Sequence, residues 1–527
     1  MNKASFKPFY FIVLFLAANL WVLNASAQKT SRITIEGADA YNYNIHLGKN
    51  IKRLIGHVRL RQDSTLFMSD SAYLDDKAKD FDGFGNVHIN VNDTLNIYGD
   101  RIHYNGGTKV AELFGTVRLQ DPKTTLTTNH LIYNRKTQIA YYDVGGTIHS
   151  DTNVLKSTTG YYNTKTHIFY FRKNVHLTSP DQQTFSDTLI YNTNNGIAFF
   201  KGPTTIKGSE STLFCTNGWY DTRNEISRLY NHPEVYSNSQ VLSADSLFYE
   251  SKTSEANAFG NIRVVDSSRQ LIVKGQLAKM WDKQGKVYIT KRAQAITYDS
   301  EDSLYMHADT LWLYFNKKRK AKKLLAYHGV RFYRTDLQGV CDSLSYTMSD
   351  STMRLFTNPV IWSGKNQLSS DTIVINITKN QVDSMTMVRD AFIISLDSNK
   401  YFNQIKGRDM VGYFRSNRIY LIKVDGNAQS VYWARDDHKR LIGINKAESG
   451  FMLIHVEDNK IVGINYIDNP SETLFPKEKL PENIKKLDGF DWKVSLRPQD
   501  KEDIFRKGKD IPNKKDKKKN IEMRKIQ

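Results

Sequence analysis

The chain has 527 residues, and its 74 lysines and arginines against 55 aspartates and glutamates give a formal net charge of +19. This length is too great for an ordinary single globular core, and two cysteines are too few for a disulfide-rich scaffold. The basic excess points to an anionic partner, although part of it lies in residues 501–527.

Residues 1–27 have the layout of a secretory signal peptide. Lys3 and Lys7 give a positive start, residues 9–23 are apolar, and Ala25-Ser26-Ala27 forms a cleavage site. An uncleaved anchor is the alternative. No later apolar run approaches the ~20 residues of a spanning helix, so we expect no spanning segment after signal cleavage.

Beyond the leader, one motif recurs through most of the chain. Residues 186–192 read small-Asp-polar-apolar-x-aromatic-Asn, and close versions return about every 29 residues, which is the mark of a repeat architecture. Alignment places the Asp-equivalent at positions 70, 100, 129, 158, 187, 216, 245, 276, 309, 342, 371 and 409.

A second motif, Gly-x-Val-x-apolar, keeps the same period, for example at residues 56–60, 85–89 and 115–119. Both motifs alternate apolar and polar residues and are separated by turn signals, which predicts half-buried strands rather than helices. The sequence therefore predicts an all-β fold, an elongated solenoid of about twelve repeats with an apolar interior.

These patterns divide the chain into four parts. After the signal peptide (1–27), we expect the repeat array over 28–415 and an atypical β capping region over 416–500, where the Asp motif is lost. Within that region, residues 476–500 carry several prolines and are predicted to cover the last strands. Residues 501–527 are lysine-rich and predicted to be a disordered tail.

The periodic Asp invites a catalytic interpretation, but a uniform column does not bring unlike roles together in one site. We interpret it as a corner residue that binds nearby backbone N–H groups. The histidines at 88, 149 and 176 share their column with arginines, which argues against a metal site. We predict no metal, no cofactor and no enzymatic activity. Cys215 and Cys341 lie four repeats apart and are predicted to be unpaired.

The inward apolar column carries the functional question. It can form a filled core, or a trough between two sheet faces that accepts acyl chains, and the residues alone favour neither. The candidate lipid-binding residues are Val58, Val87, Val117, Leu131, Tyr133, Val175, Leu189, Tyr191, Val235, Leu247, Tyr249 and Ile262.

Over residues 50–415 the paired motifs resemble the OstA/LptA-type domain of lipopolysaccharide transport, and the layout is similar to the long OstA-like proteins of Bacteroidetes. The resemblance implies a twisted open β-jellyroll in the periplasm that carries lipid A acyl chains. It also implies stacking of domains through exposed edge strands. This chain departs from the family in its larger number of repeats and in its lysine-rich ending, where the translocon member has a barrel.

Three hypotheses follow. The first is a periplasmic lipopolysaccharide-binding bridge that conveys the glycolipid towards the outer membrane, able to associate with either membrane and with other transport proteins. The second is a surface or extracellular β-solenoid, a scaffold or adhesin with a filled core. The third is a carbohydrate-active solenoid enzyme. No feature suggests a nucleic-acid partner.

Overall fold

The computed structural model describes residues 31–43 and 51–506, except 181, 238, 299–301, 318–319, 379–380, 399, 437, 439 and 459. The predicted signal peptide and residues 507–527 lie outside the described residues. The chain divides into two compact units. Unit 1 comprises residues up to Pro180 together with 187–194, and unit 2 comprises 181–186 together with 195 onward. Each is described by itself.

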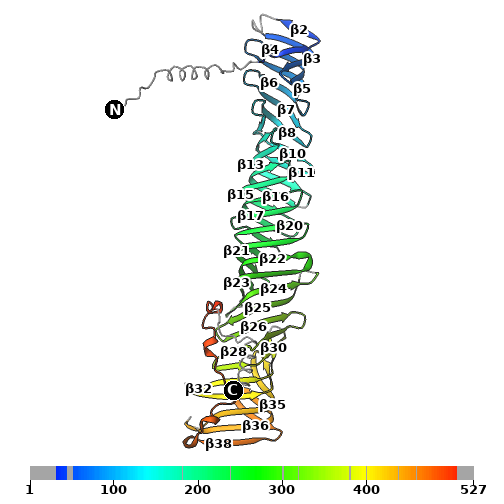
Figure 1. Ribbon diagram of the computed structural model, residues 1–527. Coiled ribbons are helices and arrows are strands. Elements are labelled where there is room, and N and C mark those ends of the chain that lie inside the picture. Colours follow the sequence, from blue (N-terminus) through cyan, green and yellow to red (C-terminus); the bar gives the residue numbers. More distant parts are fainter. Residues whose placement is uncertain are drawn as a thin grey trace, which may run out of the picture. The chain divides into compact units, whose positions relative to one another are not determined.

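Unit 1 is built from antiparallel strands that follow one another along the chain (Figure 1). The strands are β1 (Thr34–Gly37), β2 (Ala40–Tyr43), β3 (Ile51–Gln62), β4 (Thr65–Asp75), β5 (Asp80–Val91), β6 (Leu95–Asn105), β7 (Val110–Gln120), β8 (Thr124–Asn134), β9 (Ile139–Tyr142), β10 (Gly146–Ser150), β11 (Asn153–Ser157), β12 (Thr159–Asn163) and β13 (Ile168–Ser179). The residues of β14 (Gln182–Asn192) are shared between the two units.

Unit 2 has the same kind of architecture. Its strands are β15 (Ile197–Lys207), β16 (Thr212–Asp221), β17 (Ile226–Tyr230), β18 (Glu234–Ser237), β19 (Gln240–Ser243), β20 (Ser246–Glu250), β21 (Glu255–Asp266), β22 (Leu271–Trp281), β23 (Lys286–Tyr298), β24 (Ser303–Phe315), β25 (Ala321–Tyr333), β26 (Leu337–Thr347), β27 (Thr352–Phe356), β28 (Val360–Ser363), β29 (Asn366–Ser369), β30 (Thr372–Thr378), β31 (Gln381–Val388), β32 (Ala391–Ser398), β33 (Tyr401–Gly407), β34 (Asp409–Arg415), β35 (Arg418–Arg435), β36 (Leu441–Glu457), β37 (Lys460–Ile467) and β38 (Ser471–Pro476).

The remaining elements are short 3-10 helices. They are η2 (Asp282–Gln284), η3 (Lys477–Lys479), η4 (Glu482–Ile484), η5 (Val494–Leu496) and η6 (Asp503–Phe505). The described chain is thus almost entirely β-structure, as the alternating sequence patterns predict.

Each long strand bends at its middle and so contributes to two halves of the sheet. The pairing of β4 with β5 is regular on both sides of a break, which lies between Met68 and Ser71 on β4 and between Phe84 and His88 on β5. Half A contains the segments that end at turns such as 63–64 and 121–123, and half B those that end at turns such as 76–79 and 106–109. Phe67 of half A packs against Tyr104 of half B with ring centroids 4.4 Å apart, so the inner faces of the halves meet.

The bend brings the two sequence motifs into contact. Gly85 has a φ of 72° and Asn86 a φ of 43°, a backbone that favours glycine at the first position. The Asp70 carboxylate of the preceding strand fills the space that a Cβ on Gly85 would need, and accepts a hydrogen bond from Asn86 Nδ2 at 2.9 Å. Asp100 lies in the same way against Gly115 and accepts the backbone N–H of Thr116 at 2.9 Å.

The Asp column is therefore structural, but its partners differ from those expected. The carboxylates of Asp70, Asp100 and Asp245 bind the corner of the next strand rather than closing a turn within their own. The side chains that close local turns stand instead at strand ends. Asn105 is one of them, and its Oδ1 accepts the backbone N–H groups of Gly107 and Thr108.

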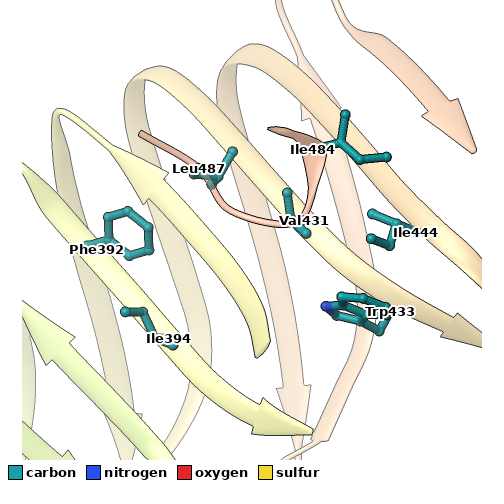
Figure 2. Packing of buried hydrophobic residues seen from close by; sticks show 7 residues of the cluster. All are labelled: Phe392, Ile394, Val431, Trp433, Ile444, Ile484 and Leu487. Atoms are coloured by element: carbon teal, nitrogen blue, oxygen red, sulfur yellow. The ribbon is translucent and has the colours of Figure 1, made fainter. Parts of the chain in front are cut away.

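The end of unit 2 carries a segment that we call the strap, residues 480–506. Ile484 and Leu487 are buried against an apolar cluster on β32, β35 and β36 that consists of Phe392, Ile394, Val431, Trp433 and Ile444 (Figure 2). Further along the strap, Leu496 packs on Val340, Val360 and Trp362. Gly339, Ile361, Leu368 and Ile393 form one row of paired residues that faces the interior. The residues that the strap contacts are their sequence neighbours, whose side chains point to the opposite face. The strap therefore covers the outer face of half A.

This arrangement corrects two expectations. Residues 476–500 were predicted to cover the end of the strand array, whereas the strap runs back along its side as far as β24 and β25. The disordered tail was also expected to begin at residue 501, which is too early in the chain. Ile504 is fully buried, and the Phe505 ring packs against His307 at 4.8 Å, so residues 501–506 belong to the strap.

Candidate functional site

The row of half B side chains that faces half A, which we call the inward row, differs between the two units. In unit 1 it forms an unbroken series of paired residues, each at most 2% exposed. Five of the eight are aromatic, so bulky rings fill the space between the halves. The row consists of Leu74, Phe81, Tyr104, Ala111, Tyr133, Ala140, Tyr162 and Phe169.

From β16 to β31 of unit 2 the same row is partly accessible to solvent, whereas Ala198 before it and Ile422 after it are buried. Over that stretch its members are half-buried, except Tyr249, which is 43% exposed. We call these residues the open row: Tyr220, Ser227, Tyr249, Ala256, Met280, Val287, Leu313, Leu324, Tyr346, Met353, Ile375 and Met385. Next to it, closer to the bends, a row that includes Ala278, Leu311 and Ala326 is buried. The interior is thus closed at the bends and accessible farther out.

Half A shows the same change. In unit 1 its inward row, exemplified by Ile89, Ile97 and Leu119, is at most 3% exposed. From β15 to β22 of unit 2 the corresponding residues are half-buried: Ile206, Leu213, Val235, Leu242, Val264 and Val273. Farther along the same row, Ala295, Phe332 and Ile361 are buried. Apolar rows on both halves are therefore partly accessible between β16 and β22.

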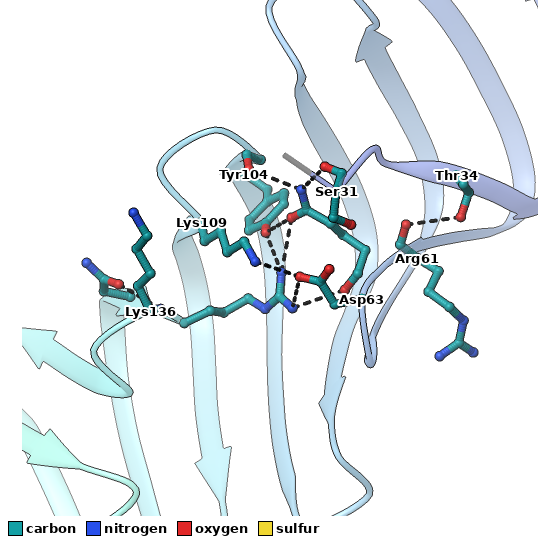
Figure 3. Close-up of polar contacts among 11 residues, drawn as sticks. Ser31, Thr34, Arg61, Asp63, Tyr104, Lys109 and Lys136 are labelled. Atoms are coloured by element: carbon teal, nitrogen blue, oxygen red, sulfur yellow. Dashed lines mark hydrogen bonds and ion pairs between the residues drawn. The ribbon is translucent and has the colours of Figure 1, made fainter. Parts of the chain in front are cut away.

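In unit 1 a polar latch joins the edges of the two halves. Arg135, with a side chain 7% exposed, donates to the backbone carbonyl of Gln62 at 3.0 Å and also binds the Gln62 side chain and the Tyr104 hydroxyl. The Asp63 carboxylate forms an ion pair with the Lys109 ammonium group at 2.7 Å (Figure 3). The Arg135 guanidinium also lies 5.8 Å from the centre of the Phe67 ring, so it covers the aromatic core.

A second latch in unit 1 joins the turn between β7 and β8, at the edge of half A, to the turn between β12 and β13, at the edge of half B. The Tyr162 hydroxyl donates to the Asp121 carboxylate and lies 3.0 Å from His167 Nδ1. Burial, followed by the hydrogen bond to the Asp121 carboxylate, raises the pKa of Tyr162, so this hydroxyl stays protonated and remains a donor. In unit 2 the edge carboxylate of Asp266 is bound differently, along its own edge by Gln240 and Arg269.

The predicted site residues fall into two groups. Ten of them are at most 8% exposed and form core: Val58, Val87, Val117, Leu131, Tyr133, Val175, Leu189, Tyr191, Leu247 and Ile262. Val235 and Tyr249 belong to the partly accessible rows of unit 2. The sequence pattern thus identifies the inward face, but most of the residues chosen lie where that face is filled.

The residues that sequence reasoning missed are the aliphatic members of the open row, above all Met280, Val287, Leu313 and Leu324. A signal for them exists in the sequence. The position that holds Tyr104, Tyr133 and Tyr162 in unit 1 remains tyrosine in some repeats of unit 2 but changes to Met280, Leu313 and Ile375 in others. Smaller side chains at the same spacing leave unfilled volume between the halves.

Among the described residues, no cluster of three or more His, Cys, Asp or Glu side chains is able to hold a metal ion. Both cysteines are free and buried, and burial raises the pKa of the Cys215 thiol to about 12. In the part of the chain that the structure describes, no helix is long and apolar enough to cross a membrane.

Comparisons with known proteins bear on the identity of the chain. Residues 30–187 match the sequence model of the OstA-like protein family, and residues 283–381 match that of the LptA/(LptD N-terminal domain) LPS transport protein. A solved structure of LptH, the LptA homologous periplasmic component of the conserved lipopolysaccharide transport device from Pseudomonas aeruginosa, is similar at 14% identity and a TM-score of 0.19. That match covers 22% of this chain and 83% of the LptH chain. No curated protein matches the chain.

The two family matches fall on opposite sides of the region in which the open row begins, one in unit 1 and the other in unit 2. They confirm the resemblance drawn from the paired Gly-x-Val and Asp motifs, and they describe transport proteins rather than enzymes. Over residues 30–187 and 283–381 the chain is therefore similar to the OstA/LptA-like lipopolysaccharide transport family.

Proposed function

We propose that the protein binds lipopolysaccharide and conveys it through the periplasm towards the outer membrane, with the acyl chains held between the two sheet halves of unit 2. The observation that carries this proposal is the open row. Apolar side chains facing inward are normally covered, and contiguous accessible ones mark ligand sites. The net charge of +19 complements the phosphates of such a glycolipid.

The filled core of unit 1 supports a different role for that part of the chain. Its latches and aromatic row leave the predicted acyl-contacting residues covered. We infer that unit 1 acts as a rigid structural element, and that lipid binding belongs to unit 2.

Strand edges are the surfaces on which we expect partner transport proteins to bind. β1 and β2 pair with β3, and β37 and β38 pair with β36, so each keeps a side without a partner among the described strands. Exposed apolar side chains lie on these strands, including Tyr41 at 53%, Val462 at 56% and Leu474 at 54%. Such edges can add a strand from another protein.

A scaffold or adhesin with a filled core remains the second candidate, because the interior of unit 1 fits it. Lipid extraction and mass spectrometry of the protein purified from its own envelope separate the two. The proposal predicts glycolipid with the wild-type protein, a strong loss of it for Leu313→Asp, and retention for Leu325→Asp, which changes an outward leucine of the next strand. Wild-type protein free of glycolipid would favour the scaffold.

A further inference from the structure

The outer face of half B in unit 2 carries an aromatic patch that the proposed path does not use. The alternation of β22, β23 and β24 directs Met280, Val287 and Leu313 inward, and places their neighbours on the opposite face. These neighbours include four aromatic rings, which we call the aromatic patch: Trp281, Tyr288, Trp312 and Tyr314.

The four rings pack on one another. Trp281 and Trp312 lie nearly parallel, at an interplanar angle of 4° with centroids 6.1 Å apart, and Trp312 and Tyr314 make an angle of 18° at the same separation. Tyr288 lies 5.0 Å from Trp312. All four are half-buried, so they form a continuous surface and do not project separately from the sheet.

A shallow hollow of about 410 Å³ adjoins this surface. Tyr288, Trp312 and Tyr327 supply aromatic walls, and the side chains of Asp309, Thr310 and His328 supply polar groups. Aromatic walls with a few polar groups are the composition of a small-molecule site. The combination suits a pyranose ring, which presents C–H groups to an aromatic wall and hydroxyls to a carboxylate, an imidazole and a hydroxyl.

The patch also carries positive charge. The ammonium groups of Lys279 and Lys286 lie 4.8 and 4.9 Å from the centre of the Trp281 ring. Glu255 pairs with Lys279 at 2.8 Å and leaves Lys286 as the less compensated cation. Exposed lysines crowd the turns at the adjoining edge of half B, at positions 252, 283, 317, 320 and 322.

Hydrogen-bond donors of the patch are available to a ligand. Within the described residues, the indole N–H groups of Trp281 and Trp312 and the Tyr288 hydroxyl have no protein hydrogen-bond partner. A surface rich in donors and cations is complementary to a ligand rich in acceptors and negative charge.

We propose that the aromatic patch and its hollow bind an anionic glycan, with a pyranose ring in the hollow and a phosphate or carboxylate near Lys286. Because the same three strands carry the open row on their inner face, the glycan is the head group of the glycolipid whose acyl chains lie inside. In this last respect the inference rests on the proposed function. The half-buried packing of the rings distinguishes the site from a membrane anchor, which presents protruding aromatic side chains.

Isothermal titration of the purified protein with the fully deacylated, phosphorylated oligosaccharide of lipopolysaccharide tests the site without acyl chains. The double variant Trp281→Ala/Trp312→Ala should bind at least about tenfold more weakly, since aromatic side chains dominate the affinity of such sites. Trp219→Ala is the matched control, a half-buried outward tryptophan of the same half, and should bind as the wild type does. Removing the phosphates or raising the salt concentration should weaken wild-type binding.

Each other outcome has a distinct meaning. Equal binding by the double variant and the wild type would overturn the site, provided that thermal unfolding shows both to be folded. Binding of the wild type to anionic phospholipid vesicles but not to the oligosaccharide would also overturn it, in favour of a membrane contact. Oligosaccharide binding through the patch, with no glycolipid extracted from the native protein, would keep the site and refute the proposed acyl path.

Discussion

Gln367 Nε2 donates a hydrogen bond to the backbone carbonyl of Asp491 at 2.7 Å, although the two residues are 124 positions apart. The Oε1 atom of the same side chain accepts the backbone N–H of Lys493, also at 2.7 Å. Gln404 binds the strap in the same manner, through the Lys485 carbonyl and the Leu487 N–H. Two glutamines on the outer face of half A thus pair with the strap as an adjacent strand would.

Replacing Gln367 by alanine should loosen the strap. The side chain is fully buried, and its loss leaves the buried indole N–H of Trp362 and two backbone groups of the strap without partners, a cost on the order of 1–3 kcal/mol. Denaturant unfolding should show this loss, and limited proteolysis should cut faster within residues 485–496. Gln381→Ala, which removes an exposed glutamine, is the control. Equal stability and equal cutting in the two variants would show that the glutamines do not hold the strap.

Sequence reasoning finds the fold because its signals are local. The alternation of apolar and polar residues around Ile89 and Ile97, together with the recurring small-Asp-polar-apolar-x-aromatic motif, predicts the strands and their inward face. The pairing of Asp70 with Gly85 could not be read in advance, since it joins two motifs on neighbouring strands. The path of the strap depends on tertiary contacts such as Gln367 with Asp491, which leave no periodic mark. The aliphatic members of the open row were missed because burial depends on the volume that both halves supply.

The first latch should stabilise unit 1. In Arg135→Ala the buried side chain of Gln62 and the Tyr104 hydroxyl lose a charged donor, which should cost about 1.5–3 kcal/mol of unfolding free energy. Lys136→Ala removes the next, exposed cation and should change stability by less than about 0.5 kcal/mol. Chemical denaturation of both variants measures the difference. Similar small effects would mean that the latch is formed without stabilising the unit.

The corner carboxylates should matter for stability alone. Asp100→Ala leaves the Thr116 N–H without its acceptor and should cost about 1 kcal/mol, while Asp100→Asn keeps an oxygen there and should cost less. Thermal unfolding gives the comparison. Full stability of the alanine variant combined with a loss of bound glycolipid would contradict the structural role of this column.

The thiols should be inert in the folded protein. Burial raises the pKa of Cys215 to about 12 and also raises that of Cys341, so almost no thiolate forms at pH 8. Because the folded-state pKa is the higher one, this contribution to stability is complete below pH 9 and is lost as the pH rises towards 12. Mass spectrometry after treatment with iodoacetamide should show no label on native protein and two labels after denaturation. Rapid labelling of native protein at pH 8 would place a thiol at the surface.

Whether lipid occupies the interior of unit 2 is tested most directly with a photo-crosslinking amino acid at neighbouring positions in cells. Leu324 and Leu325 are consecutive half-buried leucines of β25 that face opposite sides of the sheet. The account predicts that position 324 captures lipopolysaccharide and position 325 does not, and that Val117, 1% exposed in the filled core of unit 1, also captures none. Equal capture from positions 324 and 325, or capture from Val117 alone, would contradict it.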